Sequence, residues 1–213
     1  MNESEKIHQL QSILHESQAL KNLLGLIRSI ANKYDNFDTE HFCHSQHYKF
    51  LVNEMSKIKM PELNNVMNQL REPHAIIALP IKIEPKFTLF FVLVPNGLKF
   101  DWHSHPKMTG ISKCIHGEID ITTLDYHLLQ NTGLNISAYP KDRLRYEKLR
   151  HNSNVTISTI EPHALNIHKI EAKTFSAFFD LLMPDYPENT CQFFTECKET
   201  ESHLFLQELP APS

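Results

Sequence analysis

The chain has 213 residues, enough for one compact domain with extra helices or for one domain and a small cap, and its hydrophobic fraction of 41% supplies a core. Its net charge of −4 argues against a nucleic-acid-binding surface, and no apolar run approaches the ~18 residues of a membrane-spanning helix. The four cysteines form no CxxC pair and the polar N-terminus has no signal-peptide core, so we expect a cytoplasmic protein, with the nucleus as a further location. Mixed surface charge without an apolar seam predicts a monomer.

The first third of the chain has apolar residues at helical spacing. One helix is predicted over residues 5–33. A second begins at a cap provided by Asp38 or Thr39 and runs to about Lys59. Pro61 then opens a short third helix, because proline is well accommodated at the first helical position.

The pattern changes near His74, where short runs of β-branched and aromatic residues begin to alternate with turn residues. The predicted strands are 76–81, 87–94, 98–102, 111–116, 119–124, 156–160, 165–170, 176–182, 192–195 and 203–207. So many short strands indicate an antiparallel sandwich or barrel. We therefore predict a helical segment over residues 1–73 that packs on a β-barrel over residues 74–213. The charged run 141–150 is interpreted as a solvated loop or a strand edge.

The stretch between Gly97 and Gly117 contains His103 and His105, two positions apart in a strand-like setting. Side chains alternate along a strand, so these two imidazoles share one face. With 14 histidines in the chain, about one such pair is expected by chance, so the pair alone is weak evidence for a metal site. The sequence around the pair is the stronger evidence. The spacing of the glycines and histidines is similar to the first metal motif of the cupin barrels.

The usual acidic ligand of that motif is missing, because Thr109 and Gly110 occupy its place. A metal site would then need a third ligand from elsewhere, and His163 and His168 are the candidates. They are five residues apart, so on one strand they face opposite ways, and only one can join the first pair. In the run after residue 164, His168 shares a face with Asn166.

Taken together, these residues resemble the thiol dioxygenases called cysteamine dioxygenase in animals and plant cysteine oxidases in plants. The residues that carry the resemblance are His103, His105, Pro106, Met108, Lys113, Gly117, Asn166, His168, Phe179, Asp180, Leu181, Leu182, Pro184, Tyr186 and Cys191. The resemblance covers residues 74–209 and, more loosely, the helical start. It implies a mainly β, cupin-type antiparallel double-stranded β-barrel (jelly roll) preceded by α-helices, with Fe(II) bound by His103, His105 and His168.

The resemblance also implies a reaction. An Fe(II) enzyme of this family inserts both atoms of O2 into the sulfur of cysteamine or of an N-terminal cysteine and forms a sulfinic acid. Its partners would be O2 and a small thiol or an N-terminal-Cys peptide, and a peptide substrate would make it an oxygen sensor that feeds N-degron protein degradation. Free cysteine would need a cation, typically arginine, to hold its carboxylate, and the sequence assigns no arginine to this pocket. This favours cysteamine or an N-terminal cysteine as the substrate.

Roles beyond metal binding have two interpretations each. Asp180 would orient the substrate amine or an iron-bound group, or it is a helix-cap or turn carboxylate. Tyr186 would donate its hydroxyl into the pocket, or it is a core tyrosine. Cys191 matches a family cysteine that can be cross-linked to a tyrosine two residues on, but Phe193 stands there, so we expect a buried thiol.

Two further questions stay open at the level of sequence. His41, His44 and His47 recur every three residues on the predicted second helix, where a solvated polar face is favoured over a strained shared metal. The alternative functions are a cupin enzyme of other chemistry, such as another oxygenase or a metal-dependent isomerase, and a non-catalytic metal- or ligand-binding barrel.

Overall fold

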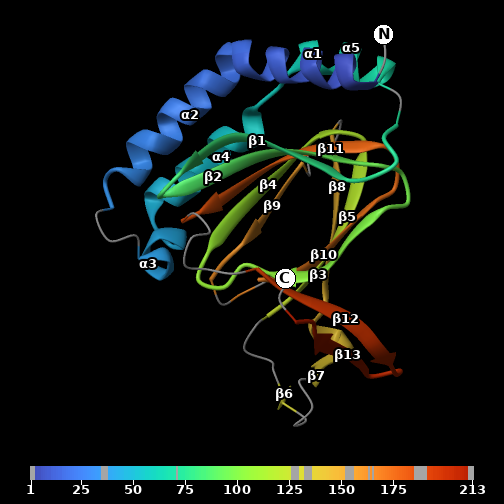
Figure 1. Ribbon diagram of the computed structural model, residues 1–213. Coiled ribbons are helices and arrows are strands. Elements are labelled where there is room, and N and C mark those ends of the chain that lie inside the picture. The colour runs from blue at the N-terminus through green and yellow to red at the C-terminus, as the bar shows by residue number, and fades with distance from the viewer. Residues whose placement is uncertain are drawn as a thin grey trace.

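The structure is a computed structural model that describes residues 3–34, 38–70, 72–125, 130–131, 136–151, 156–162, 164, 166–184 and 191–210. The helices are α1 (Glu3–Glu16), α2 (Gln18–Ala31), α3 (Thr39–Cys43), α4 (Gln46–Lys57) and α5 (Pro61–Gln69). They lie on one side of the β-structure, with α1 beside α5 at one end (Figure 1). Among the described helices, none combines the length and the apolarity needed to cross a bilayer.

The helical third is more finely divided than the sequence predicts. The single helix predicted over residues 5–33 is wrong, because the chain breaks at Ser17, whose hydroxyl accepts a hydrogen bond from the Leu20 amide at 3.3 Å and caps α2. Ser45 likewise caps α4 through the Tyr48 amide at 3.1 Å and divides the second predicted helix. Serine bonds readily to nearby backbone groups, so it competes with helix continuation. The predicted cap at Asp38 is confirmed.

The described strands are antiparallel to their partners and form two sheets. Their bounds are β1 (Ile77–Glu84), β2 (Phe87–Val94), β3 (Lys99–Ser104), β4 (Thr109–His116), β5 (Glu118–Leu124), β6 (Gln130–Asn131), β7 (Ile136–Pro140), β8 (Arg145–Arg150), β9 (Ile157–Ile160), β10 (Ile167–Ala172), β11 (Ser176–Met183), β12 (Gln192–Glu199) and β13 (His203–Glu208). One sheet has the order β1-β2-β11-β4-β9 and the other β6-β7-β13-β12-β3-β10-β5-β8. This is the expected jelly roll.

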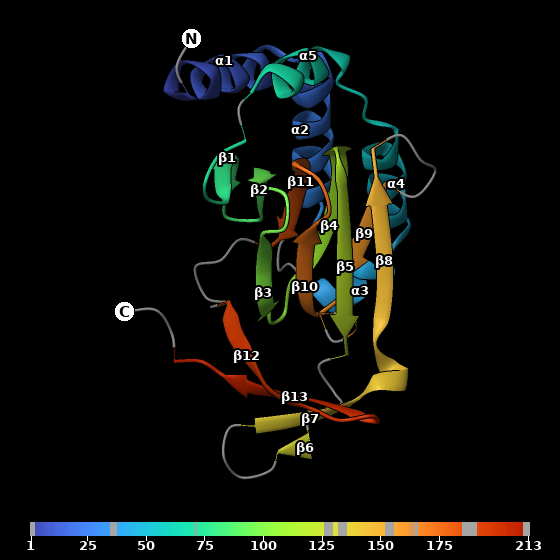
Figure 2. The same cartoon turned by 90° about the vertical axis from the view of Figure 1, so that its right-hand side faces the viewer.

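The five-stranded sheet is the wall between the helices and the barrel interior (Figures 1 and 2). Its strands β2 and β11 are buried on both faces, and their sequences are therefore nearly continuous runs of apolar residues. On β11, Phe179 packs with the helices in one core cluster, whereas Phe178 belongs to the cluster inside the barrel. The same alternation directs Asp180, two residues after Phe178, to the barrel interior.

Three described strands, β6, β7 and β8, are not among the strands predicted from the sequence. β7 was missed, and the charged run 141–150 contains a helical turn followed by β8, which is the outer strand of the larger sheet. In β8 only Leu149 is fully buried, because an edge strand covers the core with few side chains. The alternative of a strand edge for this run is therefore correct.

One core joins the helices to the sheet, and this predicts how helix mutations act. Leu51 of α4 is fully buried in that core, whereas its neighbour Phe50 is 50% exposed. We expect Leu51→Ala to lower the free energy of unfolding by about 2–5 kcal/mol and Phe50→Ala by no more than about 1 kcal/mol. Denaturant-induced unfolding measures both. Equal, small losses would contradict a core shared by the helices and the barrel.

Candidate functional site

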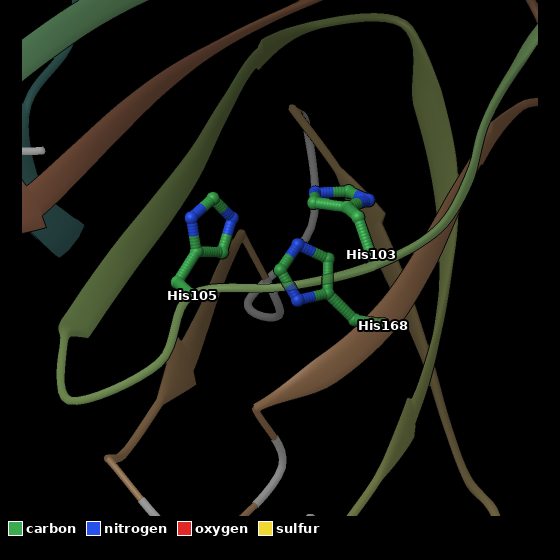
Figure 3. A group of neighbouring side chains, drawn as sticks. All are labelled: His103, His105 and His168. Carbon is green, nitrogen blue, oxygen red and sulfur yellow. The ribbon is translucent and has the colours of Figure 1, made fainter. Parts of the chain in front are cut away.

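Two neighbouring antiparallel strands bring three histidines together. His103 of β3 is paired directly with His168 of β10, so their side chains leave the sheet on the same face. His105 follows two positions after His103, just beyond the end of β3, and joins them from the same side. Figure 3 shows the three rings gathered at one point between the strands.

The three imidazoles are close enough to share one ion. Their ring centroids lie 4.2 Å apart for His103 and His168, 5.1 Å for His103 and His105, and 5.2 Å for His105 and His168. One ring nitrogen from each lies within 4.8 Å of the other two. The side chains are only 7%, 3% and 5% exposed, in the order of the sequence. The group can therefore hold a metal away from bulk water.

Burial also sets the protonation of these rings. It lowers the pKa of His103 below its ordinary value, and it lowers the pKa values of His105 and His168 well below theirs, with the neighbouring imidazoles adding to the effect. Nδ1 of His103 donates a hydrogen bond to the Asp101 carbonyl at 2.8 Å, so its Nε2 keeps a free electron pair. Neutral imidazoles with an available electron pair fit a divalent metal such as Fe(II).

The amide of Asn166 holds the loop after His105. Its Oδ1 accepts from the His105 amide at 2.8 Å, and its Nδ2 donates to the carbonyls of His105 at 2.9 Å and Met108 at 3.3 Å. Nδ2 also lies 3.0 Å from the Glu161 carbonyl. Because Asn166 is fully buried, these bonds fix the backbone of one candidate ligand to the strand that carries another.

The structure explains why no acidic ligand stands after His105. The Thr109 hydroxyl is buried and donates to the Ile160 carbonyl at 2.7 Å. A Cβ atom at Gly110 would lie 2.8 Å from Cγ1 of Ile160, so a glutamate does not fit there without displacement of that side chain. Among the described residues, the metal-binding group is made of histidine alone.

A cavity of about 230 Å³ reaches two of the three histidines: His103, His105, Asp180 and Cys191 line it together with apolar side chains. Burial raises the pKa of Asp180 to about 6, although its carboxylate accepts a hydrogen bond from the Ser112 hydroxyl at 3.0 Å. None of the described lining residues is a lysine or an arginine. The described residues of the cavity thus form an apolar wall with one carboxyl group and no fixed cation.

Other predicted residues have different outcomes. Tyr186 and His163 lie outside the described residues, so the role of Tyr186 stays a prediction. Cys191 is a free cysteine whose burial raises its pKa to about 12, and Phe193 beside it stacks on His103 with centroids 6.1 Å apart. The thiol that we expected to be buried is thus only partly buried.

The histidines of the helical segment do not converge. His41 pairs with Asp38 at 2.5 Å, and His47 lies against Tyr34 with its Nδ1 2.9 Å from the phenol oxygen. His44 is exposed at the end of α3. The structure therefore supports separate polar contacts over a metal shared by the three.

Comparison with known proteins assigns the family. The family model PCO_ADO, of the plant cysteine oxidases and cysteamine dioxygenases, matches residues 36–211. The chain belongs to this family. A relative from Dictyostelium discoideum, named a probable 2-aminoethanethiol dioxygenase, is 28% identical over 119 residues, which cover 55% of this chain and 52% of the relative. The chain thus matches about half the length of that protein.

Solved structures with similarity to this PCO_ADO chain include cupin proteins. A cupin superfamily protein from Desulfitobacterium hafniense has a TM-score of 0.39 at 13% identity. The match covers 86% of that protein and 55% of this chain. A double-stranded β-helix protein from Klebsiella pneumoniae has a TM-score of 0.41 at 12% identity, with 87% of its length and 60% of this chain covered.

Sequence reasoning placed Asn166 beside His168 but gave it no role. A polar side chain on the inner face of a strand, two residues before a candidate ligand, was the available signal. The aromatic lining of the cavity was also missed, since Phe90, Phe100 and Phe178 come from three different strands.

The bonds of Asn166 predict a mutational effect on metal binding. Asn166→Ala leaves the His105 amide and three carbonyls without this partner, so we expect metal affinity to fall about 10–100-fold. Asn166→Asp keeps the acceptor but places a carboxylate oxygen against those carbonyls, so a fall at least as large is expected. Competition with a chromophoric chelator measures both affinities. Unchanged affinity in Asn166→Ala would show that the loop is fixed by other contacts.

Proposed function

We propose that the protein is an Fe(II)-dependent thiol dioxygenase that inserts both atoms of O2 into the sulfur of cysteamine or of an N-terminal cysteine, with a sulfinic acid as product. Family membership supports a thiol dioxygenase. The observation that carries the proposal is the buried group of His103, His105 and His168, two of which line a cavity together with Asp180.

The donor set fits a ferrous ion. His103, His105 and His168 would hold it, and three neutral ligands would leave its double positive charge uncompensated. When bound, the ion would lower the pKa of a substrate thiol and supply the redox chemistry for O2. The protein would hold thiol and O2 beside each other in a small cavity, which removes much of the entropic cost of their encounter. The apolar wall would exclude water from that cavity.

Asp180 supports a substrate with a positive charge. Its carboxyl group is buried in the same cavity as the histidines and would accept a charge-assisted hydrogen bond from a substrate ammonium group. The carboxylate of free cysteine would find no lysine or arginine among the described lining residues. Cysteamine and an N-terminal cysteine carry the amine without that carboxylate, so both fit better than the free amino acid. A peptide substrate would give the protein a role in oxygen-dependent degradation, in the cytoplasm or the nucleus.

Direct measurement of the reaction tests this function. Purified protein loaded with Fe(II) is expected to consume O2 and to add about 32 Da, two oxygen atoms, to cysteamine or to an N-terminal-Cys peptide. His103→Ala is expected to lose both signals, because it removes one of three metal ligands. The control is His15→Ala, which changes an exposed histidine of α1 and should keep full activity. Iron-loaded protein that oxidises no thiol would point to a different cupin chemistry or to a binding protein.

The role of Asp180 has its own test. Asp180→Asn is expected to raise KM for cysteamine about 10–100-fold, since a charge-assisted bond is lost, and to change KM for 2-mercaptoethanol little, because that thiol has no amine. The carboxyl group gains its charge as the pH rises through about 6, so kcat/KM for cysteamine should fall below that pH in the wild type and vary less in the variant. Equal effects on both thiols would mean that Asp180 does not contact the amine.

A further inference from the structure

A second group of metal-binding side chains lies outside the cavity of the three histidines. Cys43 is the last residue of α3, His44 follows as its C-cap, and Glu161 comes directly after β9. The cysteine sulfur, an imidazole nitrogen and a carboxylate oxygen all lie within 4.8 Å of one another. Two segments that are far apart in the sequence therefore supply one compact donor set.

The donor set is open to solvent on one side. Cys43 is 5% exposed, Glu161 is partly buried and His44 is exposed, so a buried sulfur lies below more accessible nitrogen and oxygen atoms. All three residues line a cavity of about 510 Å³, which is distinct from the one at Asp180. A hydrated ion can enter this cavity, and water can complete its coordination.

We propose that Cys43, His44 and Glu161 form a second metal site, which binds a divalent transition metal of the zinc class. Thiolate, imidazole and carboxylate are the side chains that bind Zn²⁺, and three of them with one water complete its preferred tetrahedron. The thiolate distinguishes this site from the all-histidine group, because sulfur favours zinc over hard cations.

The surroundings of the Cys43 thiol are apolar and acidic. Burial raises the pKa of Cys43 to about 11, and the Glu161 carboxylate adds to the effect. The thiol therefore keeps its proton without metal and donates to the Glu40 carbonyl at 3.1 Å. On metal binding the Sγ–H bond breaks, the proton goes to solvent and the sulfur electron pair goes to the metal.

The second site is connected to the first through the backbone. The Glu161 carbonyl accepts from Asn166, whose amide also holds His105. On the other side, the Thr39 hydroxyl at the start of α3 donates to the Lys107 carbonyl at 2.7 Å, in the turn that follows His105. An ion bound by Cys43 and Glu161 would cross-link α3 to the segment that carries Asn166, and should stabilise the folded chain.

Cobalt provides the experiment, because a thiolate bound to Co²⁺ gives an intense charge-transfer absorption that histidine ligation does not. Full-length protein is titrated with Co²⁺ without oxygen and with a non-thiol reductant. The wild type is expected to show the thiolate band, and bound zinc measured by elemental analysis should exceed one equivalent. Cys43→Ser should lose the band and one equivalent of zinc, and Glu161→Gln should bind that equivalent at least roughly tenfold more weakly.

Matched variants separate the two sites. Cys197→Ser changes an exposed cysteine and should keep the band, and Cys191→Ser tests whether the cysteine of the first cavity is its source. His103→Ala should keep the band while it loses the other equivalent. A band that disappears in Cys191→Ser and persists in Cys43→Ser would overturn the proposal, as would a wild type without any thiolate band. Neither result would depend on whether the first site oxidises thiols.

Discussion

The pairing of His103 with His168 is the constraint on which the site depends. A shift of one residue in the register of β3 against β10 would turn one of the two rings to the outer face of the sheet. The register continues on both sides, since β10 also pairs with β5, and β3 with β12 at Phe193. Strand pairing thus positions two rings, and the amide of Asn166 positions the third, His105, which lies beyond the end of its strand.

The helices contribute to the same site from outside the barrel. Thr39 bonds to the Lys107 carbonyl, and the Tyr48 hydroxyl donates to the Gly110 carbonyl at 3.1 Å. Lys113 of β4 is almost fully buried and donates to the Ser56 carbonyl near the end of α4 at 3.0 Å. These contacts fasten the turn and strand after His105 to α3 and α4. The helical segment therefore acts as an outer support of the histidine-bearing hairpin, besides covering an apolar sheet.

Sequence reasoning found what depends on local periodicity. Alternation along a strand predicted that His103 and His105 share a face. The same alternation in the predicted strand 165–170 placed His168 and Asn166 on one side. Local periodicity could not predict which strands become neighbours, so the choice between His163 and His168 needed the family resemblance.

The helix breaks at Ser17 and Ser45 were missed because the apolar periodicity continues across them. Each break is made by a single hydrogen bond between the serine side chain and the backbone. An edge strand such as β8 buries too few side chains to leave a clear pattern, so the run 141–150 was interpreted as either a solvated loop or a strand edge.

The separation of the carboxylate from the histidines has a chemical consequence for the function we propose. An acidic ligand after His105 would cancel part of the metal's charge, and a side chain at Gly110 would have to displace Ile160. The acidic group of this cavity is instead Asp180, on the facing sheet, where alternation along β11 directs it inward. Positive charge would then stay at the metal, where a thiolate must bind, and negative charge would stay at the opposite wall, where an ammonium group must bind. A substrate with a thiol and an amine two carbons apart would meet both charges at once. The same division of charge explains why a free carboxylate on that substrate would be repelled by Asp180 and find no cation among the described residues of the wall.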